Sequence, residues 1–239
     1  AGFHYGHSTD LLGFLLARLE GAPLGAVLRR RVFAPLNMSD TGFAVPTAQG
    51  NRRAGLCGFD DEGRMVALTA APAGHALADR PEGMTFESGG QGLWSTLDDF
   101  LTFARMLIGD GVPGAPLLRR ETLAMMMSNQ LTPEQRAATR LLGRPIFATG
   151  HGYGMGLAGV MEPETADPLR CRGGVGTVGW PGAYGAWWQA DPNDRSVLIF
   201  LAHNMVGLHQ MARGIGLGVW GAISRFHEIA TLSATTRHN

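Results

Sequence analysis

The second half of the chain contains three successive strand-like stretches joined by short turns. The stretches are Val175–Trp180, Ala183–Ala190 and Ser196–His203, with Asp191-Pro192-Asn193-Asp194 as the second turn. An amphipathic helix is predicted after them over Leu208–Phe226. Because short turns join antiparallel neighbours, this order predicts an antiparallel meander closed by a C-terminal helix.

The part of the chain before this meander is dominated by helices and loops. Helices are predicted from Ser8 or Thr9 to Gly21, over Leu24–Phe33, from the Ser95-Thr96-Leu97-Asp98 capping box to about Gly109, and over Arg120–Ser128. Two short strands, Ala54–Phe59 and Met65–Leu68, flank the turn Asp60-Asp61-Glu62-Gly63. Residues 70–90 are rich in Ala, Pro and Gly and read as irregular. Helices segregated from strands indicate an α+β fold, with a helical region over 1–147 and the sheet with its helix over 148–239.

Composition excludes several classes of function. The 239 residues are 45% hydrophobic, which suits one large domain or two closely joined ones. All 20 basic residues are Arg, and they balance 20 acidic residues without a concentrated basic run, so no nucleic-acid partner is expected. No apolar run of about 18 residues is present, and no membrane partner is expected.

The cysteines and the first residues bear on the compartment and on the extent of the protein. Cys57 and Cys171 do not suggest a disulfide framework, which favours a reducing, cytoplasmic location. The chain starts without Met in an ordered-looking segment, so an N-terminal segment of the same protein is expected upstream. A signal in that segment would make the location periplasmic.

The string Gly6-His7-Ser8-Thr9-Asp10 is close to the G-x-S-x-G nucleophile elbow. An elbow needs a strand before the serine and a small residue where Asp10 stands, and neither is found. We therefore interpret Ser8 as a helix N-cap and not as a nucleophile.

Four motifs in order resemble one family. They are Tyr5–Gly13, the string Arg31–Phe43 with Pro35-Leu36-Asn37-Met38-Ser39-Asp40-Thr41-Gly42-Phe43, the Gly-rich run Ser88–Phe100, and Gly176–Ala186. Together they resemble the serine β-lactamase-related hydrolases, which include class C β-lactamases, penicillin-binding proteins and, closest here, the family VIII carboxylesterases. The resemblance implies a serine β-lactamase/transpeptidase-like fold, of which this chain is the C-terminal part. It also implies a small ester as substrate, cleaved through an acyl-enzyme.

The resemblance implies roles for residues in two of these motifs. Tyr5 matches the second-motif tyrosine, a base or proton shuttle, and His7 stands where lactamases have Asn. Trp180, Pro181 and Gly182 align with Lys-Thr-Gly in the substrate-binding strand, and the Ala183 N–H matches an oxyanion-hole donor. The family nucleophile lies in Ser-x-x-Lys, so in a chain without Lys it must lie upstream.

Simpler interpretations stay open for several of these residues. Tyr5 can be a packing aromatic at a helix edge, Trp180 a core residue of its strand, and His7 a residue of the cleft rim. Since Trp180 and Pro181 carry neither a cation nor a hydroxyl, small neutral esters are favoured over lactams. A D-aminopeptidase or amidase, a weak β-lactamase and a catalytically silent ligand-binding homologue are the alternatives.

No cofactor or metal is expected. His151, His203 and His209 are too widely spaced for a ligand set, and Met125-Met126-Met127 is read as helix packing. The alternating glycines of Gly150–Gly156 lack a following phosphate-binding helix, so we reject a nucleotide loop.

Overall fold

A five-stranded antiparallel sheet organises the fold. The computed structural model describes residues 2–68, 85–109, 117–141, 144–147, 150–167 and 170–235. The strand order is β5-β6-β7-β8-β9, so each strand pairs with the next in sequence. The strands are β5 (His151–Tyr153), β6 (Ala158–Val160), β7 (Val178–Pro181), β8 (Trp187–Asp191) and β9 (Ser196–Phe200). The predicted α+β class and the antiparallel meander are confirmed.

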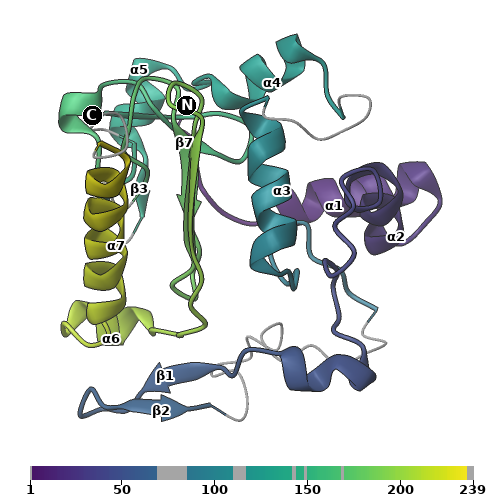
Figure 1. The fold of residues 1–239 in the computed structure, drawn as a ribbon, viewed down its shortest axis with the longest axis horizontal. Helices are drawn as coiled ribbons and strands as arrows, with labels where there is room; N and C mark the ends of the chain where they lie inside the picture. Colours follow the sequence, from purple (N-terminus) through teal and green to yellow (C-terminus); the bar gives the residue numbers. More distant parts are fainter. Residues whose placement is uncertain are drawn as a thin grey trace.

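Helices cover both faces of this sheet. Figure 1 shows the strands nearly edge-on between α7 (Gly218–Thr235) and α3 (Leu97–Leu107). Successive side chains of a strand point to opposite faces. Accordingly Trp187 meets Phe226 of α7, with ring centroids 6.5 Å apart, while Trp188 meets Phe100 of α3 at 5.3 Å. The two adjacent tryptophans of β8 thus anchor the two helical layers.

The main hydrophobic core lies on the α3 face. It joins buried residues from the first part of the chain with residues of the sheet: Phe33, Leu36, Met38, Ala104, Met106, Leu107, Leu157, Val178, Trp188 and Ala190. Asp99, buried at the start of α3, accepts hydrogen bonds from the Asp40 N–H at 2.9 Å and from the Thr41 hydroxyl at 2.8 Å. The 40–41 loop is thereby fixed to the helix that packs on the sheet.

Most predicted helices form, with different ends. The remaining helices are α1 (Ser8–Glu20), α2 (Leu24–Leu28), a π-helical turn η1 (Arg29–Phe33), 3-10 turns η2 (Thr47–Arg52) and η5 (Pro163–Thr165), α4 (Arg120–Met127), α5 (Pro133–Ala138) and α6 (Leu208–Ala212). Gly21 ends α1 in the left-handed conformation (φ 60°), as predicted.

Three predicted details of the helices are wrong. Ser8 is not the N-cap of α1: it is the first helical residue, and the cap position is His7, without a side-chain cap. The cap of α3 is Thr96 and not Ser95, because the Thr96 hydroxyl accepts from the Asp99 N–H. The helix predicted over Leu208–Phe226 is two helices, since Gly214 and Gly216 take positive φ between α6 and α7.

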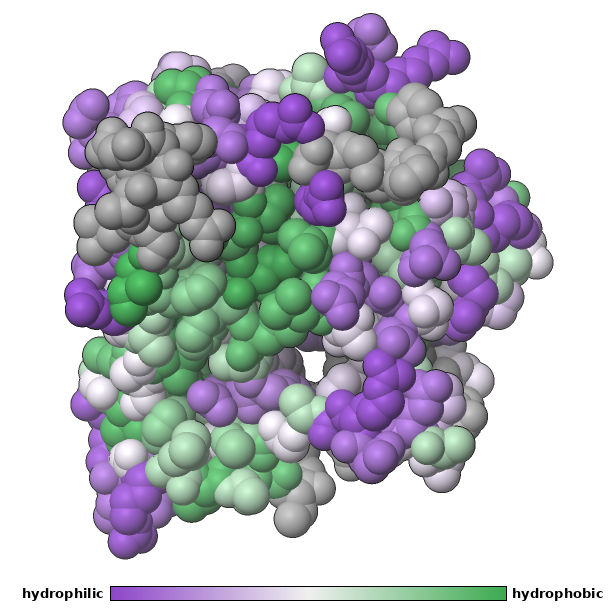
Figure 2. Space-filling view, viewed as in Figure 1, coloured by the Kyte–Doolittle hydropathy of each residue, from purple (hydrophilic) through white to green (hydrophobic). Residues whose placement is uncertain are grey.

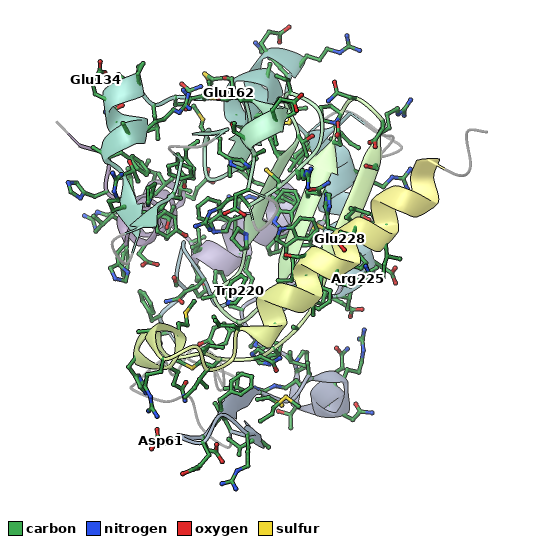
Figure 3. All side chains as sticks on the ribbon, turned by 90° about the vertical axis from the view of Figure 1, so that its left-hand side faces the viewer. Asp61, Glu134, Glu162, Trp220, Arg225 and Glu228 are labelled. Carbon is green, nitrogen blue, oxygen red and sulfur yellow. The ribbon has the colours of Figure 1, made fainter. Side chains whose placement is uncertain are left out.

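The hairpin prediction is confirmed by β1 (Cys57–Phe59) and β2 (Met65–Ala67). Figure 3 shows Asp61, in the turn of this hairpin, at the opposite end of the molecule from Glu134 and Glu162. The two-residue strands β3 (Arg140–Leu141) and β4 (Arg144–Pro145) and the β5–β6 hairpin were not predicted. Most of the irregular 70–90 stretch lies outside the described residues.

Apolar surface is exposed at two places. On α1, the large apolar side chains Leu11, Leu12, Phe14, Leu15, Leu16 and Leu19 are 38–74% exposed. Figure 2 shows an apolar area over the strands of the sheet, between α7 and α3. In the described part of the chain, no strand pairs with the outer edge of β9. The N-terminal segment expected from the sequence stays a prediction.

None of the described helices alone has the length and hydropathy of a membrane span. One pair meets the criteria jointly, Ser8–Glu20 with Leu24–Phe33, but it is bent by 77°.

Candidate active site

The fold brings Tyr5 against Trp180. The two rings lie 5.2 Å apart between centroids and are tilted by 32°. Tyr5 precedes α1 and is 44% exposed, whereas Trp180 is half-buried in β7. The second-motif and third-motif residues of the predicted site therefore lie against each other, although they are far apart in the sequence.

More aromatic rings surround this pair. Trp180 lies 5.7 Å from Tyr153 of β5 and 6.2 Å from Phe147, and Phe3 lies 5.2 Å from Tyr153. We call Phe3, Tyr5, Phe147, Tyr153 and Trp180 the aromatic wall. Burial raises the pKa of the Tyr153 hydroxyl, and the nearby Tyr5 adds to this effect. Tyr153 is therefore un-ionised at neutral pH and lines the site as a neutral ring.

The end of β7 has one backbone edge that pairs with no neighbouring strand among the described residues, as an oxyanion site requires. The pairing of β6 with β7 ends at Ala158 and Gly179, so residues 180–183 extend beyond β6. On the other side, Pro181 still pairs with Trp187, and the Gly182 N–H donates to the Ala186 carbonyl at 2.6 Å. In the described residues, one edge of this strand end is therefore unpaired.

This geometry directs the Ala183 N–H towards the unpaired edge. The Gly182 carbonyl accepts from the Gly185 N–H at 3.1 Å, inside the turn. In a trans peptide the next N–H points the opposite way, and the chain has no cis peptide bond among its described residues. Ala183 is exposed, and its N–H has no hydrogen-bond partner in the described part of the chain. An N–H in this position can donate to an oxyanion.

The same alternation explains why Pro181 is tolerated in a strand. Its nitrogen faces the side that β6 no longer occupies, so no ladder hydrogen bond is lost. Neither Pro181 nor Trp180 brings charge to this edge, in line with the sequence analysis.

His7 lies apart from the aromatic wall in its interactions. Its side chain is 92% exposed, and Nδ1 lies 3.2 Å from a carboxylate oxygen of Asp10. Asp10 also accepts from the Ser88 hydroxyl and, at 3.3 Å, from the Gly90 N–H. The Ser88 hydrogen bond is the main reason that the pKa of Asp10 is lowered, although burial opposes it. The substrate-binding role of His7 stays a prediction.

The start of α1 is held by two glycines in close contact. A Cβ added at Gly89 would lie 2.1 Å from the Thr9 carbonyl oxygen, and one added at Gly13 would lie 3.1 Å from the Gly89 backbone. Only glycine allows this approach, which fixes α1, and with it Tyr5, against the 88–90 loop. The Gly-rich run therefore has a structural function that positions the site.

Sequence reasoning missed four residues of this region. Tyr153 joins the wall through the β5–β6 hairpin, which was not predicted, and Phe147 and Phe3 pack against its ring. The fourth is Arg170, whose Cζ lies 5.8 Å from the centroid of the Trp180 ring. A single Arg in a loop carries no sequence signal, so only the fold could reveal it.

Comparison with known proteins places this arrangement in a family. The family model described as Beta-lactamase matches residues 1–216, which is most of the chain. The chain belongs to the beta-lactamase family. The resemblance inferred from the four motifs is thereby confirmed, as is the serine β-lactamase/transpeptidase-like fold.

Two curated relatives illustrate the likeness in sequence. Protein Rv1367c of Mycobacterium tuberculosis is 41% identical over 198 residues, which cover 82% of this chain and 47% of the relative. Esterase EstB of Burkholderia gladioli is 29% identical over 205 residues, which cover 80% of this chain and 47% of EstB. The chain thus spans about half the length of the curated relatives it matches.

Solved structures agree in fold. EstCE1, described as a hydrolase with promiscuous acyltransferase activity, superposes with a TM-score of 0.70 and 22% identity. The match covers 95% of this chain and 56% of EstCE1. At this identity the likeness concerns the fold alone.

Proposed function

We propose that the protein is a serine hydrolase of the carboxylesterase type, most like the family VIII carboxylesterases, which cleaves small esters through an acyl-enzyme. The observation that carries this proposal is the contact of Tyr5 with Trp180 beside an outward-facing Ala183 N–H. The nucleophile is a serine of a Ser-x-x-Lys motif, encoded upstream of Ala1. Esterase names among the relatives support the ester as substrate.

The proposed reaction uses the described residues in two roles. The serine oxygen attacks the ester carbonyl, and its proton passes to the Lys–Tyr5 pair as the new C–O bond forms. The carbonyl oxygen becomes an oxyanion held by the Ala183 N–H and by the N–H of the serine itself. The alcohol leaves with a proton returned from Tyr5, and water then hydrolyses the acyl-enzyme.

The uncharged end of β7 favours esters with small neutral, apolar groups over lactams. Trp180 and Pro181 offer neither the cation nor the hydroxyl that β-lactam enzymes use for the substrate carboxylate. A D-aminopeptidase or amidase and a weak β-lactamase remain the enzymatic alternatives. Turnover of p-nitrophenyl butyrate, a D-alanyl p-nitroanilide and nitrocefin by one preparation ranks the three activities directly.

Replacing the Tyr5 hydroxyl tests the proposal. In the protein with its own upstream segment, we expect Tyr5→Phe to lower kcat for p-nitrophenyl butyrate by about 10²–10⁴-fold, the range of general acid–base catalysis. Tyr184→Phe is the matched control, because Tyr184 packs its ring on His203 and not on the aromatic wall. Undiminished hydrolysis by Tyr5→Phe would exclude the role given to this hydroxyl.

A catalytically silent homologue is the alternative from a different class. An active serine hydrolase gains mass when a fluorophosphonate phosphonylates its nucleophile, whereas a silent homologue does not. Absence of this mass shift in the folded wild-type protein, together with absence of ester turnover, would select the silent homologue.

A further inference from the structure

The backbone of Arg170 is held in place next to the sheet. Its N–H donates to the Asp167 carbonyl at 2.9 Å, and its carbonyl accepts from the indole N–H of Trp187 at 3.1 Å. Trp187 is almost fully buried in β8. The side chain of Arg170 therefore starts from a fixed point in the loop before β7, and only its own rotamers move the guanidinium.

The guanidinium of Arg170 lies against the aromatic wall. Its Cζ is 5.8 Å from the Trp180 centroid, within the range of a cation–π contact. Burial lowers the pKa of Arg170, while the nearby Asp167 and Tyr5 act in the opposite direction. Because the ordinary pKa of a guanidinium lies far above neutral, Arg170 with its lowered pKa is still charged at neutral pH. A half-buried positive charge therefore lies beside Tyr5 and Trp180.

This guanidinium differs from other arginines of the chain in its partners. Arg30 and Arg31 pair with Glu20, Arg52 pairs with Asp40, and Arg64 pairs with Asp60. Among the described residues, the Arg170 side chain makes no salt bridge or hydrogen bond; its guanidinium lies over the Trp180 ring, and Asp167 and Tyr5 act on it electrostatically. The five N–H donors of a guanidinium suit a carboxylate in a bidentate arrangement.

We propose that Arg170 binds a carboxylate group of the substrate, so that the preferred ester is a monoanion whose apolar part lies on the aromatic wall. This inference rests on the proposed function and changes its substrate from a wholly neutral ester to an ester that carries one carboxylate. In this arrangement the ester bond and the apolar group of the substrate, both uncharged, lie at β7. The substrate carboxylate lies beside Arg170, in the loop before that strand. The cation that Trp180 fails to supply from the strand is thus supplied from a different element.

Paired substrates test the role of Arg170. Mono-p-nitrophenyl glutarate, which carries a carboxylate on its acyl group, is compared with the neutral p-nitrophenyl valerate. 3-Acetoxybenzoate, which carries a carboxylate on its leaving group, is compared with the neutral phenyl acetate. In at least one pair, we expect Arg170→Met to lower the anionic-to-neutral ratio of kcat/KM by about 10- to 100-fold. Arg170→Lys retains the positive charge but loses the two parallel N–H donors of the guanidinium, so its ratio should lie between those of the wild type and Arg170→Met.

Arg172→Met is the matched control. Arg172 is exposed, and its backbone N–H and carbonyl form hydrogen bonds with the side chains of Gln189 and His227. Its substitution should leave both ratios unchanged. Equal ratios in wild type and Arg170→Met for both pairs would overturn the inference, provided that circular dichroism shows the same fold.

A binding measurement separates this inference from the proposed function. If the wild-type protein hydrolyses none of the four esters, the proposed function fails. Isothermal titration with 3-phenylpropionate, an aromatic ring with one carboxylate, then decides the inference alone. Binding that weakens by about 10- to 100-fold or more in Arg170→Met supports the inference. Binding that is absent in the wild type, or equal in the wild type and the variant, overturns it.

Discussion

The close approach of Gly89 to α1 makes one methyl group a strong perturbation. In Gly89→Ala the new Cβ would lie 2.1 Å from the Thr9 carbonyl oxygen, whereas real Cβ atoms essentially never come within 3.0 Å of a heavy atom. The two segments must therefore separate by about 0.9 Å. Because the obstacle is backbone, no side-chain rotation relieves it. We expect a loss of about 1–3 kcal/mol in the free energy of unfolding.

The same displacement should reach the site. α1 begins at Ser8, soon after Tyr5, so a shift of its first turn moves the Tyr5 hydroxyl relative to Trp180. A misplacement of about 1 Å can cost about 10²-fold in rate. We therefore expect kcat/KM for p-nitrophenyl butyrate to fall by about that factor in Gly89→Ala.

Urea unfolding and ester hydrolysis, measured on the same preparations, check both effects. Gly50→Ala is the matched control, because a Cβ at Gly50 meets nothing within 4 Å. This control should be neutral or stabilising by about 0.4–1 kcal/mol. If Gly89→Ala unfolds at the same urea concentration as Gly50→Ala and keeps its activity, the steric argument is refuted.

Two further predictions concern buried polar groups. Burial raises the pKa of the Cys171 thiol to about 12. In the native protein at pH 8, iodoacetamide should therefore label the half-buried Cys57 and leave Cys171 unmodified. Peptide mass mapping that finds Cys171 alkylated first would contradict this prediction. Burial alone would raise the pKa of Asp191, but donors that include the Asn193 N–H outweigh it and lower this pKa. Ionised Asp191 thus stabilises the folded state fully above its unfolded-state pKa, at about pH 4. This stabilisation is lost as the pH falls through its pKa in the folded protein, which is the lower of the two. Asp191→Asn should therefore have a lower urea midpoint than wild type at pH 7, with the gap narrowing below about pH 4; a constant gap down to pH 3 would contradict the prediction.

The sheet could be predicted from sequence because its signals are local. The three apolar runs are separated by few residues. β9 forms within its run, and β7 and β8 each end one residue beyond theirs, at Pro181 and Asp191. The ends of helices depended on geometry that the sequence does not carry. The hydroxyls of Ser8 and Thr96 are both suitable caps, and only the path of the incoming chain decides that Thr96 is used and Ser8 is not.

The candidate site was predictable only where a motif existed. Tyr5 and Trp180 were chosen by resemblance, and the fold adds that their rings touch. Arg170 and Tyr153 carry no local pattern, since their importance comes from tertiary contacts with Trp180. The β5–β6 hairpin was overlooked because its glycines weaken the strand signal; Gly152 and Gly159 are needed there because Asn129 and the Met127 carbonyl lie against them.

The contact between Tyr5 and Trp180 also has a consequence for the order of folding. It joins residue 5 to residue 180, so it closes a loop of about 175 residues, roughly three quarters of the chain. Contacts between residues so distant in sequence carry the largest loop-closure entropy and form after local hairpins and helices. During synthesis, α1 is completed long before β7 emerges, and until then Tyr5 cannot contact Trp180. The site is therefore among the last parts of the molecule to assemble and, on partial unfolding, among the first to lose its geometry.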